Sequence, residues 1–450
     1  MEVPYEFHLR LERLAMVQIS ASLWKLPSIL QQMKTFFTKD HAGEFQLLLI
    51  QYVTELHQKE NWGVIISHIT SMKHSFLPVF LKPSVMYLVE QMGMRIFEWL
   101  RSVTAKLLKY SKIEDYAQNI EYFIDNIEWT SMGTIDSIQI FKNRYDNPNI
   151  DKDYFMWFEA CNYCLEDYAK NLWAQRSPES KQKTISKISG TIDDDFCLVA
   201  YWQSIIDKVP DIKQQLFMKN GRAVNRLCSS RDSIAVVMFK LSVYLGNEHA
   251  VRYFWNMMSC EERTKKAITG CEIILERRCT YPYCYATYCK KCSDIFCFLL
   301  LQMTHEERLQ LIANEFDKTY DPFNTWILLL NWPWEDLFVQ TLERAWGCFS
   351  IFDCKFFINK FETTVYTVDE NYKLPQTSVY HKEILYKVCM SSPRNLRPHF
   401  TSRYKQLTTP PPEVTRKGPE IVRKLRLLKK PRLEFRSRCR HKKLRIERQE

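Results

Sequence analysis

The sequence predicts an all-α protein, built as a helical-hairpin repeat array of the α-solenoid kind and followed by a disordered basic C-terminal tail. The first observation is that the chain has only 10 glycines in 450 residues, although average usage is roughly 7%. β-Hairpins and phosphate-binding loops depend on glycine, so its scarcity favours helices. The second is that apolar residues recur at three- and four-residue steps, the period of an α-helix. The third is that positive charge gathers at the C-terminal end.

The clearest helix is predicted over residues 85–107. Pro83 and Ser84 open it, and Ser111 follows its end. Its apolar face consists of Val85, Leu88, Val89, Met92, Ile96, Trp99, Leu100, Val103 and Leu107. This spacing places all nine side chains on one side of a single helix.

Further stretches carry the same amphipathic pattern. Arg10, Glu12 and Arg13 among apolar neighbours indicate an amphipathic N-terminal helix and not a cleaved signal segment. Sustained two-residue alternation is scarce, and residues 363–368 are the best strand candidate. The other predicted helices cover residues 44–60, 113–129, 154–174, 196–209, 233–245 and 326–346.

Two signals divide the chain near residues 143–152. This polar run contains Asn147, Pro148 and Asn149, and none of the 15 cysteines precedes Cys161. The composition changes again after Pro393. We therefore expect an N-terminal helical domain over 1–146, a degenerate helical-repeat domain over 147–395 and a basic, proline-containing tail over 396–450.

A weak pattern recurs in the second of these domains, over residues 173–181, 255–263 and 300–308. In each segment a large apolar residue is followed four positions later by Ser or Thr, then by Glu and then by a basic residue. The hydroxyl can cap the next helix, and acids favour its first turn. Each segment therefore predicts a helix–turn–helix junction.

The last two junctions also satisfy the capping-box spacing, with Glu262 after Ser259 and Glu307 after Thr304, whereas the first has Ser180 at that position. The steps between the segments, 82 and 45 residues, fit a unit of about 40 to 45 residues with one unrecognised copy. Chance similarity of amphipathic helices is the competing interpretation. Ankyrin and full tetratricopeptide signatures are absent, so no family is assigned.

Several catalytic classes are excluded by the spacing of glycine. No two glycines lie closer than 20 positions, whereas Walker A loops, dinucleotide-binding loops, kinase phosphate loops and nucleophile elbows need glycines within a few residues. No H-E-x-x-H motif occurs, and the acids after His305 are interpreted as first-turn helix residues. His381 begins H-x-E, but no P-C-x-x-C follows it. Standard hydrolytic zinc chemistry is not predicted.

Four thiols within fourteen positions form the one metal-site candidate: Cys279, Cys284, Cys289 and Cys292. Four thiolates can hold a structural zinc, but the first pair is four residues apart and the gap between pairs is short. Ordinary buried thiols are the favoured interpretation. Cys161 and Cys164 are expected to pack in the core. The three aspartates at 193–195 are interpreted as the start of a helix in preference to a magnesium site.

The tail contains 17 Lys or Arg and 5 Glu over residues 401–450, whereas the first 400 residues hold 46 basic and 47 acidic groups. Residues 420–430 form a basic amphipathic segment that suits an import receptor, nucleic acid, an anionic membrane or a calmodulin-like groove. Nuclear import or nucleic-acid contact is the first choice. The residues expected to make these contacts are Arg423, Lys424, Arg426, Lys429, Lys430, Arg432, Arg436, Arg438, Arg440, Lys442 and Lys443.

These features together predict a non-catalytic helical-repeat scaffold or adaptor that binds other proteins. The first alternative is a nucleic-acid-binding protein that uses the tail, and the second is an enzyme with an unrecognised all-α active site. Reduced cysteines and the absence of a long apolar run predict an intracellular protein, nuclear or cytoplasmic, without a transmembrane segment. No cofactor is predicted, and zinc at the four cysteines is the one possibility kept open.

Overall fold

The structure, a computed structural model, describes residues 11–39, 51–72, 77–110, 115–190, 197–209, 226–280, 285–317, 328–330, 332–348 and 384–408. Within these ranges the chain is helical and has no β-strand, and Trp129 and Ile135 form an isolated antiparallel bridge. The all-α prediction is therefore confirmed for this part of the chain. Two compact units are distinguished, Met1–Tyr404 and Lys405–Glu450. The predicted strand at 363–368 and the aspartates at 193–195 lie outside the described residues.

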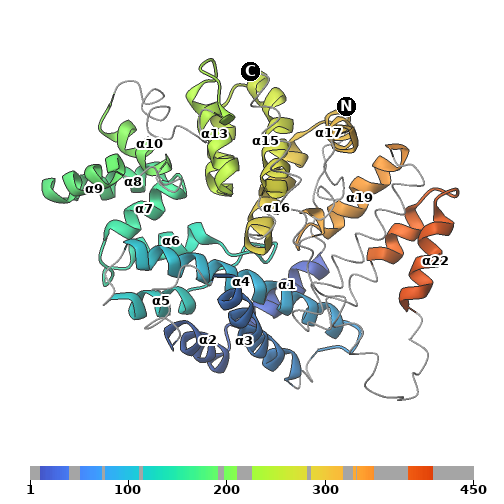
Figure 1. The fold of residues 1–450 in the computed structure, drawn as a ribbon. Helices are drawn as coiled ribbons and strands as arrows, with labels where there is room; N and C mark the ends of the chain where they lie inside the picture. The colour runs from blue at the N-terminus through green and yellow to red at the C-terminus, as the bar shows by residue number, and fades with distance from the viewer. Residues whose placement is uncertain are drawn as a thin grey trace. The chain divides into compact units, whose positions relative to one another are not determined.

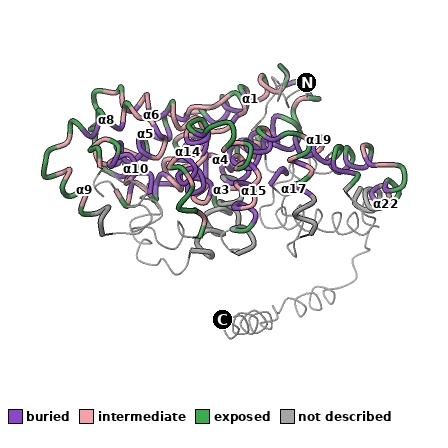
Figure 2. Tube along the Cα trace, turned by 90° about the horizontal axis from the view of Figure 1, so that it is seen from above, coloured by how far each residue is buried: buried purple, intermediate pink, exposed green. Residues whose placement is uncertain are grey.

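The N-terminal helices pack around one long helix, α4. They are α1 (Leu11–Trp24), α2 (Pro27–Lys39), α3 (Gln51–Ser71), α4 (Lys82–Tyr110) and α5 (Tyr116–Asp125). Helix α4 contacts α1, α3 and α5, and it is mostly buried in Figure 2. The helix predicted over 85–107 is confirmed as the middle of α4, and its apolar face is the buried one.

Tryptophans fill the space between α1, α3 and α4. Trp24 and Trp62 stack with ring centroids 5.8 Å apart, and the Trp62 indole donates to the main-chain oxygen of Gly93 at 2.9 Å. A Cβ atom on Gly93 would lie 2.3 Å from Trp24. The close approach of α1 to α4 therefore requires glycine at this position.

A second group of helices follows: α6 (Ser137–Asp146), α7 (Tyr154–Asn162), α8 (Glu166–Ala174), α9 (Pro178–Gly190) and α10 (Cys197–Ile206). The single helix predicted over 154–174 is wrong, because it breaks between α7 and α8. Cys164 has a positive φ of 53°, and Leu165 N donates to Ala160 O at 2.9 Å, which is a Schellman ending. Cys161 and Cys164 are both buried, as predicted.

Buried charge links α6 to α7 across the polar run at 143–152. Arg144 is 1% exposed, donates to Glu159 at 3.3 Å and lies over the ring of Phe155. The first part of the run, residues 143–146, belongs to α6, and residues 147–153 connect the two helices. The domain boundaries at 146/147 and 395/396 remain predictions.

The next helices form two successive hairpins. They are α13 (Ile234–Leu245), α14 (Glu248–Met257), α15 (Cys260–Thr280), α16 (Tyr285–Gln302) and α17 (His305–Asp317). Helix α13 packs on α14, and α15 packs on α16. The hairpins also contact each other through α13 with α15 and through α14 with α16, and Figure 1 shows α13, α15 and α16 side by side.

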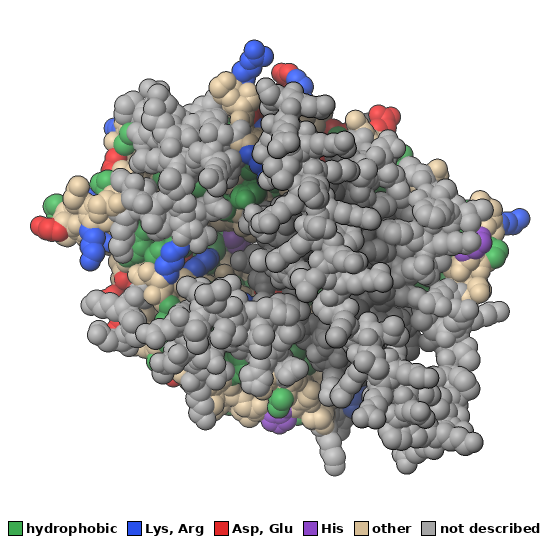
Figure 3. All heavy atoms as spheres, in the orientation of Figure 1, with side chains coloured by type: hydrophobic (Ala, Val, Ile, Leu, Met, Phe, Trp, Pro, Cys, Tyr) green, Lys and Arg blue, Asp and Glu red, His purple; other side chains and the backbone are tan. Residues whose placement is uncertain are grey.

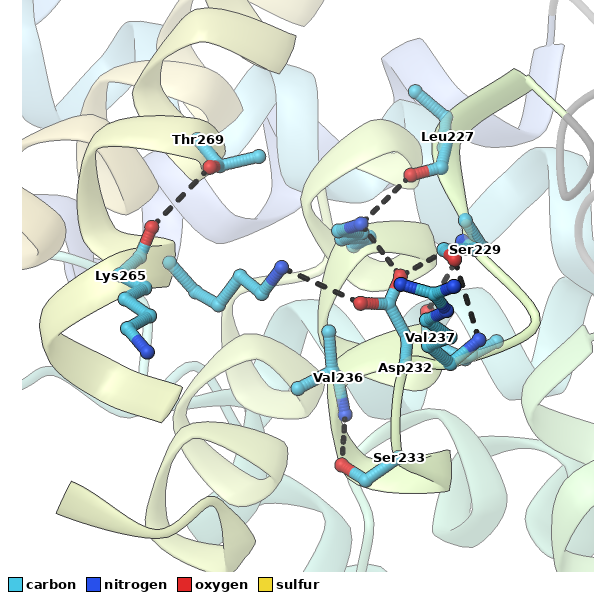
Figure 4. A network of polar contacts seen from close by, with 12 residues as sticks. Leu227, Ser229, Asp232, Ser233, Val236, Val237, Lys265 and Thr269 are labelled. Carbon is cyan, nitrogen blue, oxygen red and sulfur yellow. Dashed lines mark hydrogen bonds and ion pairs between the residues drawn. The ribbon is translucent and has the colours of Figure 1, made fainter. Parts of the chain in front are cut away.

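The start of α13 is fixed by a polar network (Figure 4). The Asp232 carboxylate accepts hydrogen bonds from Lys240 at 2.7 Å and from Lys266 of α15 at 3.3 Å. Ser233 caps the helix by accepting from Val236 N at 3.3 Å. The network therefore ties the first turn of α13 to the neighbouring hairpin.

The predicted capping at the three junctions is confirmed. Ser177 Oγ accepts from Ser180 N, Ser259 Oγ from Glu262 N and Thr304 Oγ1 from Glu307 N, each at 3.2 Å. The carboxylates of Glu262 and Glu307 in turn accept hydrogen bonds from the Ser259 and Thr304 amides. The last two junctions are therefore capping boxes, and the first is a simple hydroxyl cap.

The basic residue of the pattern has a role that the sequence did not reveal. Arg263 donates to the main-chain oxygens of Met258 and Asn256, at the end of the preceding helix. Arg308 does the same with Met303 and Leu300. In the first junction Lys181 instead lies over the ring of Trp173. Two of the three junctions thus join the end of one helix to the start of the next through an arginine.

The last described helices are α19 (Glu335–Ala345), the short 3-10 helix η4 (Trp346–Cys348) and α22 (Arg397–Thr408). The single helix predicted over 326–346 is interrupted: Leu328 and Leu329 are helical, and α19 begins only at Glu335. Pro333, between them, has no amide hydrogen and disfavours helical conformation in the residue before it. Arg397 donates to the main-chain oxygens of Met390 and Ser392. An arginine therefore also ends the helical segment that precedes α22.

Candidate functional site

A cavity of about 320 Å³ lies where α4, the turn at residues 130–137, the end of α7, the α13–α14 turn and α16 meet. Its ionisable lining residues are Arg95, Glu98, Lys106, Asp136, Tyr163, Glu248, His249 and Asp294. Trp99, Ile135, Phe158 and Leu245 supply apolar surface. Cavities of this size with a few converging polar groups are typical of ligand sites.

The α13–α14 turn forms one wall. Gly246 ends α13 with a φ of 70°, a left-handed conformation that favours glycine. Asn247 then caps α14 by accepting from Ala250 N at 3.1 Å and donates to the main-chain oxygen of Asn162 at 2.9 Å. These bonds hold the first turn of α14, with Glu248 and His249, against the end of α7.

The turn at residues 130–137 forms a second wall. The Thr130 and Thr134 hydroxyls are 2.8 Å apart, and Asp136 caps α6 by accepting from Gln139 N at 2.9 Å. Gly133 has a φ of 83°, and a Cβ atom there would lie 2.7 Å from Trp332. The turn is therefore held in place from within and by the segment before α19.

A two-bond ion pair crosses from α4 to α16. Arg95 donates to Asp294 Oδ2 at 2.7 Å and to Oδ1 at 3.1 Å, and to the main-chain oxygen of Trp332 at 2.6 Å. The Trp334 indole donates to Asp294 Oδ1 at 2.7 Å. Both charges are thus engaged with protein groups, and the pair joins the N-terminal helices to the hairpins.

His249 is neutral at physiological pH. Burial lowers its pKa to about 4, and Arg252 and Lys106 act in the same direction against the opposing effect of Asp136. The imidazole meets the Tyr163 ring edge-on, with centroids 5.1 Å apart. Burial also raises the pKa of Tyr163 well above its usual value. Both rings therefore act as neutral hydrogen-bonding groups.

The other charged groups in the cavity differ in whether they bond to protein partners. Glu248 Oε1 accepts from Arg252 at 2.9 and 2.7 Å, while its second oxygen bonds to no described residue. Lys106 forms no ion pair with a described residue. The groups in the lining that remain available to a ligand are therefore the Lys106 ammonium group, one Glu248 carboxylate oxygen and the His249 ring nitrogens.

The predicted zinc ligands are only partly described. Cys292 is 1% exposed in α16. Cys279 and Cys289 belong to α15 and α16, but their side chains lie outside the described residues, as does Cys284 altogether. The described residues contain no group of three or more His, Cys, Asp or Glu able to hold a metal. The zinc site remains a prediction.

The eleven basic tail residues between 423 and 443 also lie outside the described residues, as does His381. Glu306 and Glu307 do stand in the first turn of α17, as predicted. The cavity was not predictable from the sequence, because its lining comes from five separate parts of the chain between residues 95 and 294. Asp136 before α6 and the pair Gly246-Asn247 are the local signals that mark two of its walls.

No protein-family model matches the chain, and no curated protein matches it either. Among the described helices, none is both long enough and apolar enough to cross a membrane.

Proposed function

We propose that the chain is a non-catalytic helical-repeat scaffold or adaptor that binds other proteins. The observation that carries this proposal is the packing of two successive hairpins, α13–α14 and α15–α16, each followed by a junction with the same capping box and the same arginine. The second junction follows the first after 45 residues. A recurring unit of this length, stacked on its neighbour, is the building principle of α-solenoids, which bind proteins and peptides along extended surfaces.

The cavity supports binding more than chemistry. Arg95 and Asp294 neutralise each other, Asp136 caps a helix and Glu248 pairs with Arg252. General acid–base catalysis works best with a group whose pKa lies near the operating pH, and the pKa of His249 is lowered to about 4. The alternative function is an enzyme with an all-α active site, and this lining would have to supply its catalytic groups.

The basic tail suggests a separate role in nuclear import or in contact with an anionic partner. Acidic and basic side chains both occur on the described part of the face in Figure 3, in line with 46 basic and 47 acidic groups in the first 400 residues. Residues 401–450 hold 17 basic and 5 acidic groups, so the tail is the segment expected to attract phosphates electrostatically. Nucleic-acid binding by the tail is therefore the second candidate function.

The test of the scaffold is proximity labelling in cells with three forms of the full chain. They are the wild type, the pair Arg263→Met/Arg308→Met, and Arg231→Met as a surface control, since Arg231 is exposed. We expect one reproducible set of protein partners that the control keeps and the double variant loses while its helix content is retained. The proposal is contradicted if the chain folds but none of its three forms labels a protein partner above background.

The tail is tested by removing residues 405–450. Loss of nuclear signal without loss of the labelled partners supports the import role. Nucleic-acid affinity that depends steeply on salt and vanishes with the tail supports the second candidate. Binding that survives the deletion with the same salt dependence contradicts a tail site.

A further inference from the structure

We propose that the cavity between α4, the turn at 130–137 and the start of α14 binds a free amino acid or a similarly small zwitterion. Lys106 and the His249 imidazole would hold its carboxylate, and Glu248 would hold its ammonium group. This site is independent of the protein partners proposed above.

Size sets the first limit on the ligand. The cavity measures about 320 Å³, at the lower end of the roughly 300–1,000 Å³ of known small-molecule sites. It opens among Trp99, Phe158 and Leu245 as well as the polar groups. A compact molecule with two polar ends and a short side chain fits these conditions better than a nucleotide or a peptide segment.

The floor of the cavity is one face of α4 with opposite charges at its ends. Glu98, Ser102 and Lys106 all line it, at successive four-residue steps on the same face. The rise of 1.5 Å per residue places the Glu98 and Lys106 backbones about 12 Å apart. A dipolar ligand can lie along this face with its negative end toward Lys106.

The positive pole is formed by Lys106, His249 and two helix starts. Lys106 has no ion-pair partner among the described residues. His249 is neutral and can donate one hydrogen bond. Both α6 and α14 begin at the cavity, and helix N-termini favour negative charge. Asp136 opposes this pole, but it caps α6 through Gln139 N.

The negative pole stands one residue away, at Glu248. Its Oε1 is taken by Arg252, which leaves the other oxygen for a donor in the cavity. Glu98 is 6% exposed on α4, and its charge acts on the neighbouring Arg95, which Asp294 already neutralises. Glu248 and His249 are consecutive in the first turn of α14 and both line the cavity, so one short helical segment contributes to both poles.

Ligands with a single charge fit less well. Four carboxylates and two basic groups line the cavity, so a phosphate or another free anion is repelled overall. A simple amine satisfies the acidic groups but offers no acceptor to Lys106 and the His249 ring. A zwitterion satisfies both poles at once.

The experiment uses the full chain and measures binding by calorimetry and by thermal shift. The twenty common L-amino acids are compared with the amines and carboxylic acids that lack one of the two charged groups, and with inorganic phosphate. We expect at least one amino acid to bind and to raise the melting temperature. Its amine and acid analogues should bind roughly tenfold weaker or worse, since each loses a charged hydrogen bond.

Two variants locate the site. Lys106→Met and Glu248→Gln should each abolish the binding, whereas Lys82→Met, the same change at an exposed position of the same helix, should leave it unchanged. Far-UV circular dichroism verifies that each variant keeps its helix content. The proposal is overturned if no amino acid binds at millimolar concentration, if the amines or phosphate bind as tightly as the amino acid, or if Lys106→Met binds like wild type.

Discussion

Arg308 donates a hydrogen bond of 2.6 Å to the main-chain oxygen of Met303, the residue that separates α16 from the cap of α17. It also donates to Leu300 at 2.7 Å and is 8% exposed. Arg308→Met removes the side-chain donor from both buried carbonyl oxygens, and only that of Leu300 keeps another bond with a described residue, from Met303 N at 3.2 Å. The loss should cost about 1–3 kcal/mol in the free energy of unfolding. Urea denaturation measures the loss, and exposed Arg231→Met should change the midpoint little. Equal effects of the two variants would contradict the role assigned to Arg308.

Gly93 and Gly63 provide a matched pair of helix glycines. A Cβ atom on Gly93 meets Trp24 at 2.3 Å, whereas one on Gly63 meets no atom within 4 Å. Gly93→Ala should therefore destabilise the protein by about 1–3 kcal/mol through overpacking. Gly63→Ala should stabilise it by roughly 0.5–1 kcal/mol through helix propensity. The two denaturation midpoints must move in opposite directions, and a shift of both the same way would refute the packing argument.

The ion pair between Arg95 and Asp294 has side chains only 11% and 13% exposed. Arg95→Met leaves the Asp294 carboxylate in a poorly solvated place, so we expect a loss of about 3–5 kcal/mol. The double variant Arg95→Met/Asp294→Leu should lose less than the sum of the single variants. Lys265→Met serves as the comparison, because its pair with Glu261 is 68% and 81% exposed. Additive losses in the double variant would show that the two charges are not coupled.

His249 should make stability depend on pH in the acidic range. Its pKa falls from 6.5 to about 4 on burial, so the unfolded chain binds more protons than the folded one between these two values. The free energy of unfolding therefore rises with pH from about 4 to 6.5. His249→Phe, which keeps an aromatic ring against Tyr163, should flatten this part of the profile. His68→Gln on the exposed face of α3 should keep it, and an unchanged profile in His249→Phe would contradict the assignment.

Cysteine reactivity should separate core thiols from surface thiols. Burial raises the pKa of Cys164 to about 12 and that of Cys161 well above its usual value, whereas Cys260 is exposed. Iodoacetamide at pH 8 should modify Cys260 before Cys161 and Cys164, which should stay intact until the protein is denatured. Mass spectrometry of the digested protein measures the order. Early modification of Cys161 would argue against its place in the core.

Patterns within one helix were the most predictable part of the fold. The apolar residues of α4 and the capping of Ser259 and Thr304 are local features, and the structure agrees with both. The break at Cys164 was not predictable in the same way, because helices that end in a left-handed residue usually place Gly or Asn there. In this protein α7 ends where the Cys161 and Cys164 thiols are buried, and that burial depends on helices distant in the sequence.

The cavity could not be predicted for a related reason. Lys106 and His249 come from two helices and Asp136 from the turn before a third, and the three carry no common motif. The bonds from Arg263 and Arg308 to the preceding helix ends were equally unpredictable, since the sequence shows only a basic residue after the acids. Long-range contacts of this kind depend on the tertiary arrangement.

The arginine junctions bear on how the hairpins lose structure. In each of them one guanidinium, carried by the first turn of the following helix, holds the last carbonyl oxygens of the helix before it. Fraying at the end of α16 must therefore break bonds that also anchor the beginning of α17, and the same holds for α14 and α15. Local opening should then involve neighbouring helices together, so amide hydrogens on both sides of such a turn exchange with solvent at similar rates.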